Sequence, residues 1–401
     1  MGTKRMPLEG LRVLELGQLL AGPFAGMLLA NFGAEVIKVE PPKVGDPLRR
    51  WRGMYRGTSL WWVVMSRNKK CITLDLKSER GQQLCRELAA RSDILVENFR
   101  PGTLERWGLG PEALWAVNPR LIIVRVSGWG QTGPYAGRPG YASVAEAMGG
   151  IRYVMGHPDR PPIRPNLSLG DTIAGLHAAF AALVAVYARD VLGIGRGQVV
   201  DVSLAEAVFN MTESMLPEYD KLGVVRERQG TKLSGIAPTN TYRCQDGRYV
   251  VIGGNGDSIF RRLMYAIGRP DLAEDPRLAH NDGRVAHEQE IDEAIEAWTQ
   301  KHTLEEVVQI LERAQVPCGP IYSIADVVKD PHFQARGLFE DVELAPGDWV
   351  KIPAIVPFLS ETPGHTRWIG PPLGAHNEEI FGQLLGLSLS EIAALQEAGI
   401  I

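Results

Sequence analysis

The sequence predicts an α/β protein in which both ends of the chain build a large domain and a smaller α+β domain lies between them. Through residues 11–126, runs of aliphatic residues alternate with amphipathic stretches, which is typical of strands and helices in turn. After residue 224 a polar linker precedes a hairpin and amphipathic helices, and after residue 330 the pattern returns to strands and closing helices. We therefore predict a large domain from residues 1–224 and 331–401, and a small domain from residues 225–330.

The first forty residues predict a strand, a helix and a second strand. Leu11–Gly17 forms the first strand, Phe24–Phe32 the helix and Ala34–Glu40 the second strand, so the sheet begins as a parallel one. The glycines of the first turn are spaced G-x4-G-x3-G and not G-x-G-x-x-G. This predicts a Rossmann-like architecture that lacks the dinucleotide-binding fingerprint.

The large domain continues with further strands, each of which opens into a loop at its carboxyl end. Open α/β sheets place their ligands at that edge. A long helix is predicted over Leu204–Leu222 after the last of these strands. The predicted strands are Cys71–Leu76, Ile94–Glu97, Leu121–Val126 and Gly197–Ser203.

The small domain is predicted to begin with a hairpin formed by Thr241–Cys244 and Tyr249–Ile252. Gly253–Gly256 follows as a glycine-rich loop that runs into a helix. Glycine permits close approach to a ligand, so this loop is a candidate lid, and the alternative is a plain turn with Asp257 as a helix cap. Amphipathic helices are predicted over His287–Lys301 and Leu304–Ala314.

Net charge and cysteine spacing indicate which kinds of binding partner to expect. The 401 residues carry a formal net charge of −4 without a long basic run, so we expect neither a nucleic-acid nor a membrane partner. The four cysteines lack C-x-x-C spacing, which argues against a zinc site or a disulfide framework and favours a reducing cytoplasm. We therefore expect no metal, and small molecules as partners.

Asp171 stands at the start of a helical run rich in Ala, Leu, Phe and Val. We expect nearly every face of this helix to be buried. A helix N-terminus favours an anion by roughly 0.3–1 kcal/mol, so Asp171 should stay ionised near pH 7 and be available as a nucleophile. The alternative is that Asp171 only caps the helix.

Taken together, several short motifs resemble the family III CoA-transferases, also called the CaiB/BaiF family, to which formyl-CoA transferase and the succinate–hydroxymethylglutarate CoA-transferases belong. They run in family order from end to end. The matching segments are Ala21–Pro23, Gly33–Glu40, Gly45–Asp46, Asn68–Lys70, Val96–Gly102, Ser127–Pro134, Arg138–Tyr141, Gly170–Asp171 with Gly175, Gly195–Gln198 and Gly253–Gly256.

The resemblance implies a two-domain fold and a homodimer whose subunits are interlinked like rings. It assigns the nucleophile to Asp171, and the lid to Gly253, Gly254, Asn255 and Gly256. Two departures, Leu20 and Ala142, stand where formyl-CoA transferase has Gln and Glu, and they disfavour formyl and oxalyl substrates. The CoA-binding positions that it implies are Asn68, Lys69, Lys70, Arg106, Arg138 and Tyr141.

The implied reaction moves CoA from succinyl-CoA, or another dicarboxylyl-CoA, to a free carboxylic acid. An enzyme carboxylate can do this through an anhydride and an aspartyl-CoA thioester, with CoA as substrate and no further cofactor. A closing lid would keep water from hydrolysing the anhydride. Arg52, Arg164 and Lys232 are loop cations that could receive a distal carboxylate, although such residues are more often solvated surface charges.

Two rival functions differ in class. A 2-methylacyl-CoA racemase of the same superfamily needs a His in a Gly-His-Asp motif, and this chain has Arg138–Tyr141 there, without a His. A CoA-binding protein without activity would need neither Asp171 nor the glycine loop.

Overall fold

The computed structural model describes residues 5–401, which form two compact units. The first contains the chain up to Ile151, Pro165–Glu213 and Ala335–Ile401, so it draws on both ends of the chain. The second contains Arg152–Arg164 and Ser214–Gln334. Domain limits at residues 224 and 330 stay a prediction.

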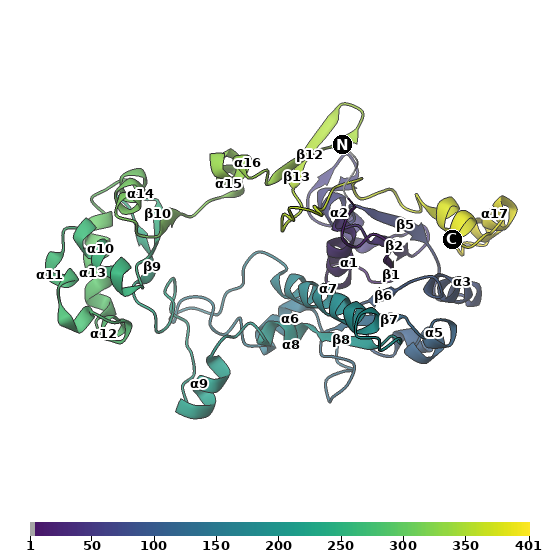
Figure 1. The fold of residues 1–401 in the computed structure, drawn as a ribbon, viewed down its shortest axis with the longest axis horizontal. Coiled ribbons are helices and arrows are strands. Elements are labelled where there is room, and N and C mark those ends of the chain that lie inside the picture. Colours follow the sequence, from purple (N-terminus) through teal and green to yellow (C-terminus); the bar gives the residue numbers. More distant parts are fainter. Residues whose placement is uncertain (1–4) are drawn as a thin grey trace. The chain divides into compact units, whose positions relative to one another are not determined.

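A six-stranded parallel sheet forms the centre of the first unit (Figure 1). Its spatial order is β5-β2-β1-β6-β7-β8, and every neighbouring pair is parallel. Counted along the chain, this is the order 3-2-1-4-5-6 of doubly wound sheets, which reverses between β1 and β6. The strands are β1 (Arg12–Glu15), β2 (Glu35–Glu40), β5 (Lys69–Thr73), β6 (Ile94–Glu97), β7 (Ile122–Ser127) and β8 (Val199–Ser203).

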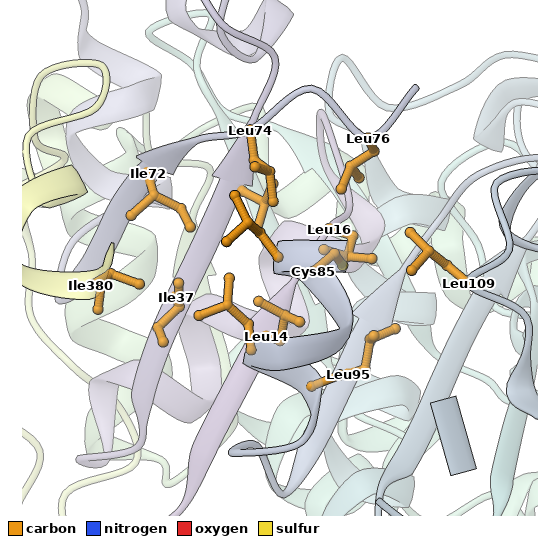
Figure 2. Close-up of a cluster of buried hydrophobic side chains, with 14 of the residues drawn as sticks. Leu14, Leu16, Ile37, Ile72, Leu74, Leu76, Cys85, Leu95, Leu109 and Ile380 are labelled. Atoms are coloured by element: carbon orange, nitrogen blue, oxygen red, sulfur yellow. The ribbon is translucent and has the colours of Figure 1, made fainter. Parts of the chain in front are cut away.

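Helices cover both faces of this sheet, so its strands carry buried apolar residues on both faces. One face packs Leu14, Leu16 and Ile37 against Cys85 and Ile380 (Figure 2). The helices on that face are α3 (Glu79–Ala89), α4 (Thr103–Arg106), α5 (Pro111–Val117), the π-helical η3 (Glu378–Leu384) and α17 (Leu389–Glu397). The other face carries α1 (Ala21–Asn31), α6 (Ala142–Met148), α7 (Leu169–Asp190) and α8 (Leu204–Phe209).

Helix α2 (Leu60–Met65) follows Ser59, whose hydroxyl accepts from the Trp62 N–H and caps the helix. One local prediction was wrong. The single long helix expected over Leu204–Leu222 is divided into α8 and α9 (Met215–Leu222). Glu213 between them has a φ of +52°, which a right-handed helix cannot accommodate.

Helix α7 is less buried than its composition predicted. Its inner face packs on the sheet, but Leu176, Phe180, Val184, Tyr187 and Val191 are 51–68% exposed. These five residues recur every three or four positions, so they form one apolar stripe along the helix. Among residues 5–401, α7 is also the one helix long and apolar enough to cross a membrane, a test that core helices pass as well.

Shorter elements complete the first unit. The helical turn η1 (Pro47–Arg50) and the small hairpin of β3 (Met54–Tyr55) and β4 (Thr58–Ser59) lie between β2 and α2. The C-terminal segment adds an antiparallel hairpin of β12 (Phe339–Ala345) and β13 (Asp348–Pro353) before η3.

The second unit is a small α+β arrangement with its own apolar core. The predicted hairpin is present as β9 (Thr239–Arg243) and β10 (Tyr249–Gly253), and β11 (Cys318–Pro320) adds a third antiparallel strand. Its helices, besides α9, are α10 (Asp257–Ala266), α11 (Pro270–Ala273), η2 (Pro276–Leu278), α12 (Asn281–Ala286), α13 (Glu288–Thr299), α14 (Leu304–Arg313), α15 (Ile324–Lys329) and α16 (Pro331–Ala335).

Candidate active site

Asp171 lies in the first turn of α7 and is half-buried. The N-cap residue is Ser168, three positions earlier, so the alternative in which Asp171 is the N-cap of this helix was wrong. The Gly170 N–H donates to Glu146 Oε1 at 3.0 Å, and Glu146 is itself buried. A second carboxylate therefore fixes the backbone immediately before Asp171.

The lack of a side chain at Gly175 allows α7 to approach α1 closely. A side chain at this position would place its Cβ 2.7 Å from the Ala21 carbonyl oxygen and 3.0 Å from the Phe24 Cβ, so only glycine permits this crossing. Asp171 precedes Gly175 by four residues and therefore lies on the same face of α7. That face is the one turned towards the start of α1.

The turn between β1 and α1 lies at the carboxyl edge of the sheet, where the strand order reverses. Asn98, just after β6, holds this turn with two hydrogen bonds: its Oδ1 accepts from the Gln18 N–H and its Nδ2 donates to the Gln18 carbonyl, each at 2.8 Å. A Cβ on Gly17 would lie 2.7 Å from Asn98 Oδ1. Leu19 adopts a φ of +64°, which is unusual for a residue with a side chain.

Four buried charged residues support this turn from below: Glu15, Lys38, Asp46 and Lys69, which we call the inner charge cluster. Glu15 and Lys38 are direct partners across β1 and β2. Glu15 binds Lys38 at 3.1 Å and Lys69 at 2.7 Å, and Lys38 binds Asp46 at 2.9 Å. The two positive and two negative charges compensate each other, because all four side chains are buried away from solvent.

The inner charge cluster reaches the turn through hydrogen bonds. The ammonium groups donate to carbonyl oxygens, Lys38 to Gly17 at 2.9 Å and Lys69 to Pro23 at 2.7 Å. Asp46 accepts from the Leu19 N–H. The cluster therefore fixes the backbone on both sides of the turn.

Protonation in the inner charge cluster follows from its contacts. Burial acts to lower the pKa of Lys38, but Asp46, Glu15 and Glu40 together hold that pKa above its ordinary value. Burial acts to raise the pKa of Asp46, yet the Lys38 ammonium and two backbone N–H groups hold it below its ordinary value. Both groups are therefore charged near neutral pH.

Gly26 on α1 faces the same cluster. A Cβ at this position would lie 1.9 Å from Glu15 Oε2, so a larger residue cannot be placed there without moving the helix or the carboxylate. The first-turn glycines, which do not form a dinucleotide fingerprint, thus make room for Asn98 and Glu15.

The predicted CoA-binding run Asn68–Lys70 has other partners in this structure. Asn68 is buried and binds the C-terminal segment, donating to the His365 carbonyl at 2.8 Å and accepting from the Arg367 N–H at 2.7 Å. Lys69 is fully buried in the inner charge cluster. Lys70 bridges Glu35 and Glu379. A contact from CoA to the Lys69 ammonium would require rearrangement, and CoA binding by these three residues stays a prediction.

The other predicted CoA contacts are exposed. Arg106 ends α4 and donates to the Thr103 hydroxyl at 2.9 Å. Arg138 stacks on the Tyr135 ring, with 3.8 Å from its guanidinium carbon to the ring centroid, and Tyr141 is 72% exposed. Their role in binding CoA stays a prediction as well.

The glycine loop lies in the second unit, directly after β10. Gly253 and Gly254 donate their N–H groups to the carbonyls of Pro317 and Pro238, each at 2.9 Å. The Asn255 carbonyl accepts from buried Arg284 at 2.7 Å, and Gly256 is the N-cap residue of α10. Asp257 is therefore not the cap, and it binds Arg284 and His280 instead. A lid function stays a prediction.

Sequence reasoning missed Asn98, Asp46 and the Glu15–Lys38 pair. The signal was present for the last of these, because charged residues interrupted two otherwise apolar strands. Asn98 lay in a motif that we assigned to the family without a physical role. Among residues 5–401, no group of three His, Cys, Asp or Glu side chains is placed to hold a metal ion.

Comparison with known proteins identifies relatives over almost the full length. The sequence model of CoA-transferase family III matches residues 8–377. The succinyl-CoA–D-citramalate CoA-transferase of Chloroflexus aurantiacus is 51% identical, over 98% of this chain and 98% of its own. The succinate–glutarate CoA-transferase of Agrobacterium fabrum is 34% identical, over 96% of this chain and 97% of its own.

A solved structure shows the same fold. The crystal structure of a CAIB/BAIF family protein from Brucella suis is 34% identical and superposes with a TM-score of 0.83, covering 95% of this chain and 100% of that one. The predicted mixed α/β architecture with a large parallel sheet is therefore confirmed.

Proposed function

The chain belongs to CoA-transferase family III, and from this premise we propose that it transfers CoA from succinyl-CoA, or another dicarboxylyl-CoA, to a free dicarboxylic acid, using Asp171 as the nucleophile. The observation that carries this proposal is the position of Asp171, on the glycine-containing face of α7 that meets the start of α1. The choice of acids rests on the two relatives, whose names specify succinyl, citramalate and glutarate groups.

The reaction begins when the Asp171 carboxylate attacks the thioester carbonyl of the donor. The carbon–sulfur bond breaks, the CoA thiolate leaves with the electron pair, and a mixed anhydride forms. The thiolate then attacks the Asp171 carbonyl carbon, which releases the donor acid as a carboxylate and leaves CoA on Asp171 as a thioester.

The second half repeats these steps in reverse order. The acceptor carboxylate attacks the Asp171 thioester, which gives a second anhydride and free thiolate. The thiolate attacks the acceptor carbonyl of that anhydride, and the new acyl-CoA leaves with Asp171 restored as a carboxylate. Each step consumes one anion and releases one, so the reaction needs no redox cofactor and no net proton transfer.

Geometry near Asp171 supports this chemistry. The first turns of α1 and α7 both carry backbone N–H groups, and neither Leu20 nor Ser168 makes a side-chain cap hydrogen bond, whereas the Gly170 N–H donates to Glu146. Such N–H groups stabilise negative charge on an attacked carbonyl. The Gly253–Gly256 loop remains our proposed lid, with the N–H groups of Asn255 and Gly256 as candidate donors.

Replacing Asp171 tests the nucleophile. We expect Asp171→Ala and the isosteric Asp171→Asn to lose turnover by several orders of magnitude, because no carboxylate remains to accept the acyl group. Mass spectrometry of the wild-type protein mixed with succinyl-CoA should show a CoA adduct on the peptide containing Asp171, and hydroxylamine should remove it. Unchanged turnover in Asp171→Ala would exclude the covalent mechanism.

The proposed assembly is a homodimer, and the apolar stripe of α7 supports it. Five large apolar side chains in a row are unusual on a monomer surface and typical of an interface. The proposed compartment is the cytoplasm, which suits four cysteines that are all free.

A charge placed on the stripe tests the assembly. We expect Phe180→Glu to convert a dimer into monomers in sedimentation experiments, because a carboxylate would be desolvated in the interface. Val117→Glu, on an exposed apolar residue of α5 outside the stripe, is the matched control and should stay dimeric. A wild-type protein that sediments as a monomer would contradict the proposal.

A further inference from the structure

A pocket of about 370 Å³ adjoins the first turn of α7. Its walls are largely apolar and include Leu20, Trp61 and Met65. Leu169 and Thr172, which flank Asp171 along the chain, line it as well. The volume falls within the range of about 300–1,000 Å³ that small-molecule sites occupy.

Arg52 is the one charged residue in this lining. Its guanidinium lies over the Trp61 ring, 4.6 Å from the centroid, which orients the planar group without neutralising its charge. Among residues 5–401, no acidic side chain forms an ion pair with Arg52. Its backbone has a φ of +57°, in the left-handed region, where a residue with a side chain is strained.

The other two loop cations considered from the sequence are placed differently. Lys232 pairs with Asp292 at 2.6 Å and Glu288 at 3.3 Å, so its charge is already compensated. Arg164 belongs to the second unit, whereas Arg52, the pocket and Asp171 all belong to the first. Arg52 is thus the cation of the three that combines an uncompensated charge with a cavity lined by the first turn of α7.

We propose that this pocket is the subsite for the acyl chain and that Arg52 binds the distal carboxylate of a dicarboxylic acid. A guanidinium presents a fork of N–H donors that matches a carboxylate in bidentate geometry. The apolar walls receive the carbon chain between the two acid groups. Arg52 therefore selects dicarboxylic over monocarboxylic substrates, an inference that rests on the proposed CoA transfer.

The test compares pairs of acids that differ only in the distal carboxylate. Succinate is matched with butyrate, and glutarate with pentanoate, as CoA acceptors under a fixed donor. Donor selectivity is measured separately, as the rate of the CoA adduct from succinyl-CoA and from butyryl-CoA. We expect Arg52→Gln to lower kcat/KM for the diacids by about 10- to 100-fold, the loss that one charge-assisted contact typically causes.

The monoacids should change by less than about threefold, so the diacid preference should collapse. Arg52→Lys should retain part of the preference, because it keeps the charge but loses the fork. Arg50→Gln is the matched control, since Arg50 is an exposed cation two residues away that does not line the pocket, and its selectivity should equal that of the wild type.

Three outcomes would overturn the assignment. Arg52→Gln could weaken monoacids and diacids equally, which would make Arg52 a structural residue. It could raise the KM for every acyl-CoA without changing acceptor selectivity, which would place a CoA phosphate at Arg52. The wild-type protein could show no diacid preference at all. Failure of the proposed function is distinct, because the wild-type protein would then form no acyl-CoA from any of these acids.

Discussion

The first unit holds its charges in two contrasting ways, within the segment of chain from β1 to β5. The inner charge cluster is fully buried and electrically compensated, and its ammonium groups bind backbone carbonyls. The loop around Arg52 is exposed, and its cation lies against an aromatic ring without a carboxylate among the described partners. The buried cations therefore hold carboxylates and backbone carbonyls in place, whereas Arg52 keeps a charge that no described carboxylate compensates.

Lys69 and Lys70 show how two neighbouring cations can have different environments. The sequence places Lys69 and Lys70 next to each other, but alternate residues of β5 point to opposite faces of the sheet. Lys69 therefore enters the inner charge cluster on the α1 side, and Lys70 pairs with Glu35 and Glu379.

Removing one charge from the inner charge cluster should cause the largest loss of stability. Lys38→Met leaves Glu15 and Asp46 without a shared cation in a site that water does not reach, so we expect a loss of about 3–5 kcal/mol in the free energy of unfolding. Urea denaturation monitored by circular dichroism measures it. A loss below about 1 kcal/mol would show that the cluster is more hydrated than its burial indicates.

We expect overpacking of the inner charge cluster to lower the free energy of unfolding by less than Lys38→Met does. Gly26→Ala adds a methyl group that would lie 1.9 Å from Glu15 Oε2, so the carboxylate or α1 must shift, at a cost of about 1–3 kcal/mol. Gly57→Ala is a poor control because Gly57 has a φ of +82°, whereas Gly137 has open space around its Cβ position and no such φ. Gly137→Ala should therefore unfold at the same urea concentration as the wild type.

Glu97 combines features of the inner charge cluster and of the exposed Arg52 loop. It is buried and binds Arg125, and Arg125 also binds half-exposed Glu105. Burial raises the pKa of Glu97 to about 7. Between the ordinary pKa of about 4.3 and pH 7, the folded state therefore holds a proton that the unfolded chain has lost.

The stabilisation that protonated Glu97 contributes is complete below a pH of about 4.3 and is lost as the pH rises through about 7. We expect the wild type to lose up to about 1.4 kcal/mol per pH unit relative to Glu97→Gln, which cannot titrate. Denaturation of both proteins from pH 4.5 to 8 measures the difference. Parallel pH profiles would mean that Arg125 keeps Glu97 ionised in the folded state throughout.

The smallest effect on stability should come from Arg52. Its side chain is exposed and makes no ion pair with the described residues, so Arg52→Ala should change the free energy of unfolding by less than about 0.5 kcal/mol. The same denaturation assay measures it beside Lys38→Met. A loss comparable to that of Lys38→Met would remove the distinction between the two regions and would make Arg52 a structural cation.

The sequence alone determined the alternating α/β pattern and the position of Asp171 in the first turn of an apolar helix. These are local properties, because strand and helix periods and helix starts depend on neighbouring residues. It also gave the family, since short motifs keep their order along the chain. It did not divide α8 from α9 correctly, because the break at Glu213 depends on a backbone conformation that composition does not reveal.

Only the tertiary structure decided which charges pair and which stay available. Glu15, Lys38 and Asp46 are separated by up to 31 positions along the chain, and no local pattern predicts that they meet beneath one turn. The same holds for Arg52 and Leu169, which reach one pocket from distant segments. The physical reason is that electrostatic energy depends on distance and burial in three dimensions, and both quantities exist only once the sheet and its helices have packed.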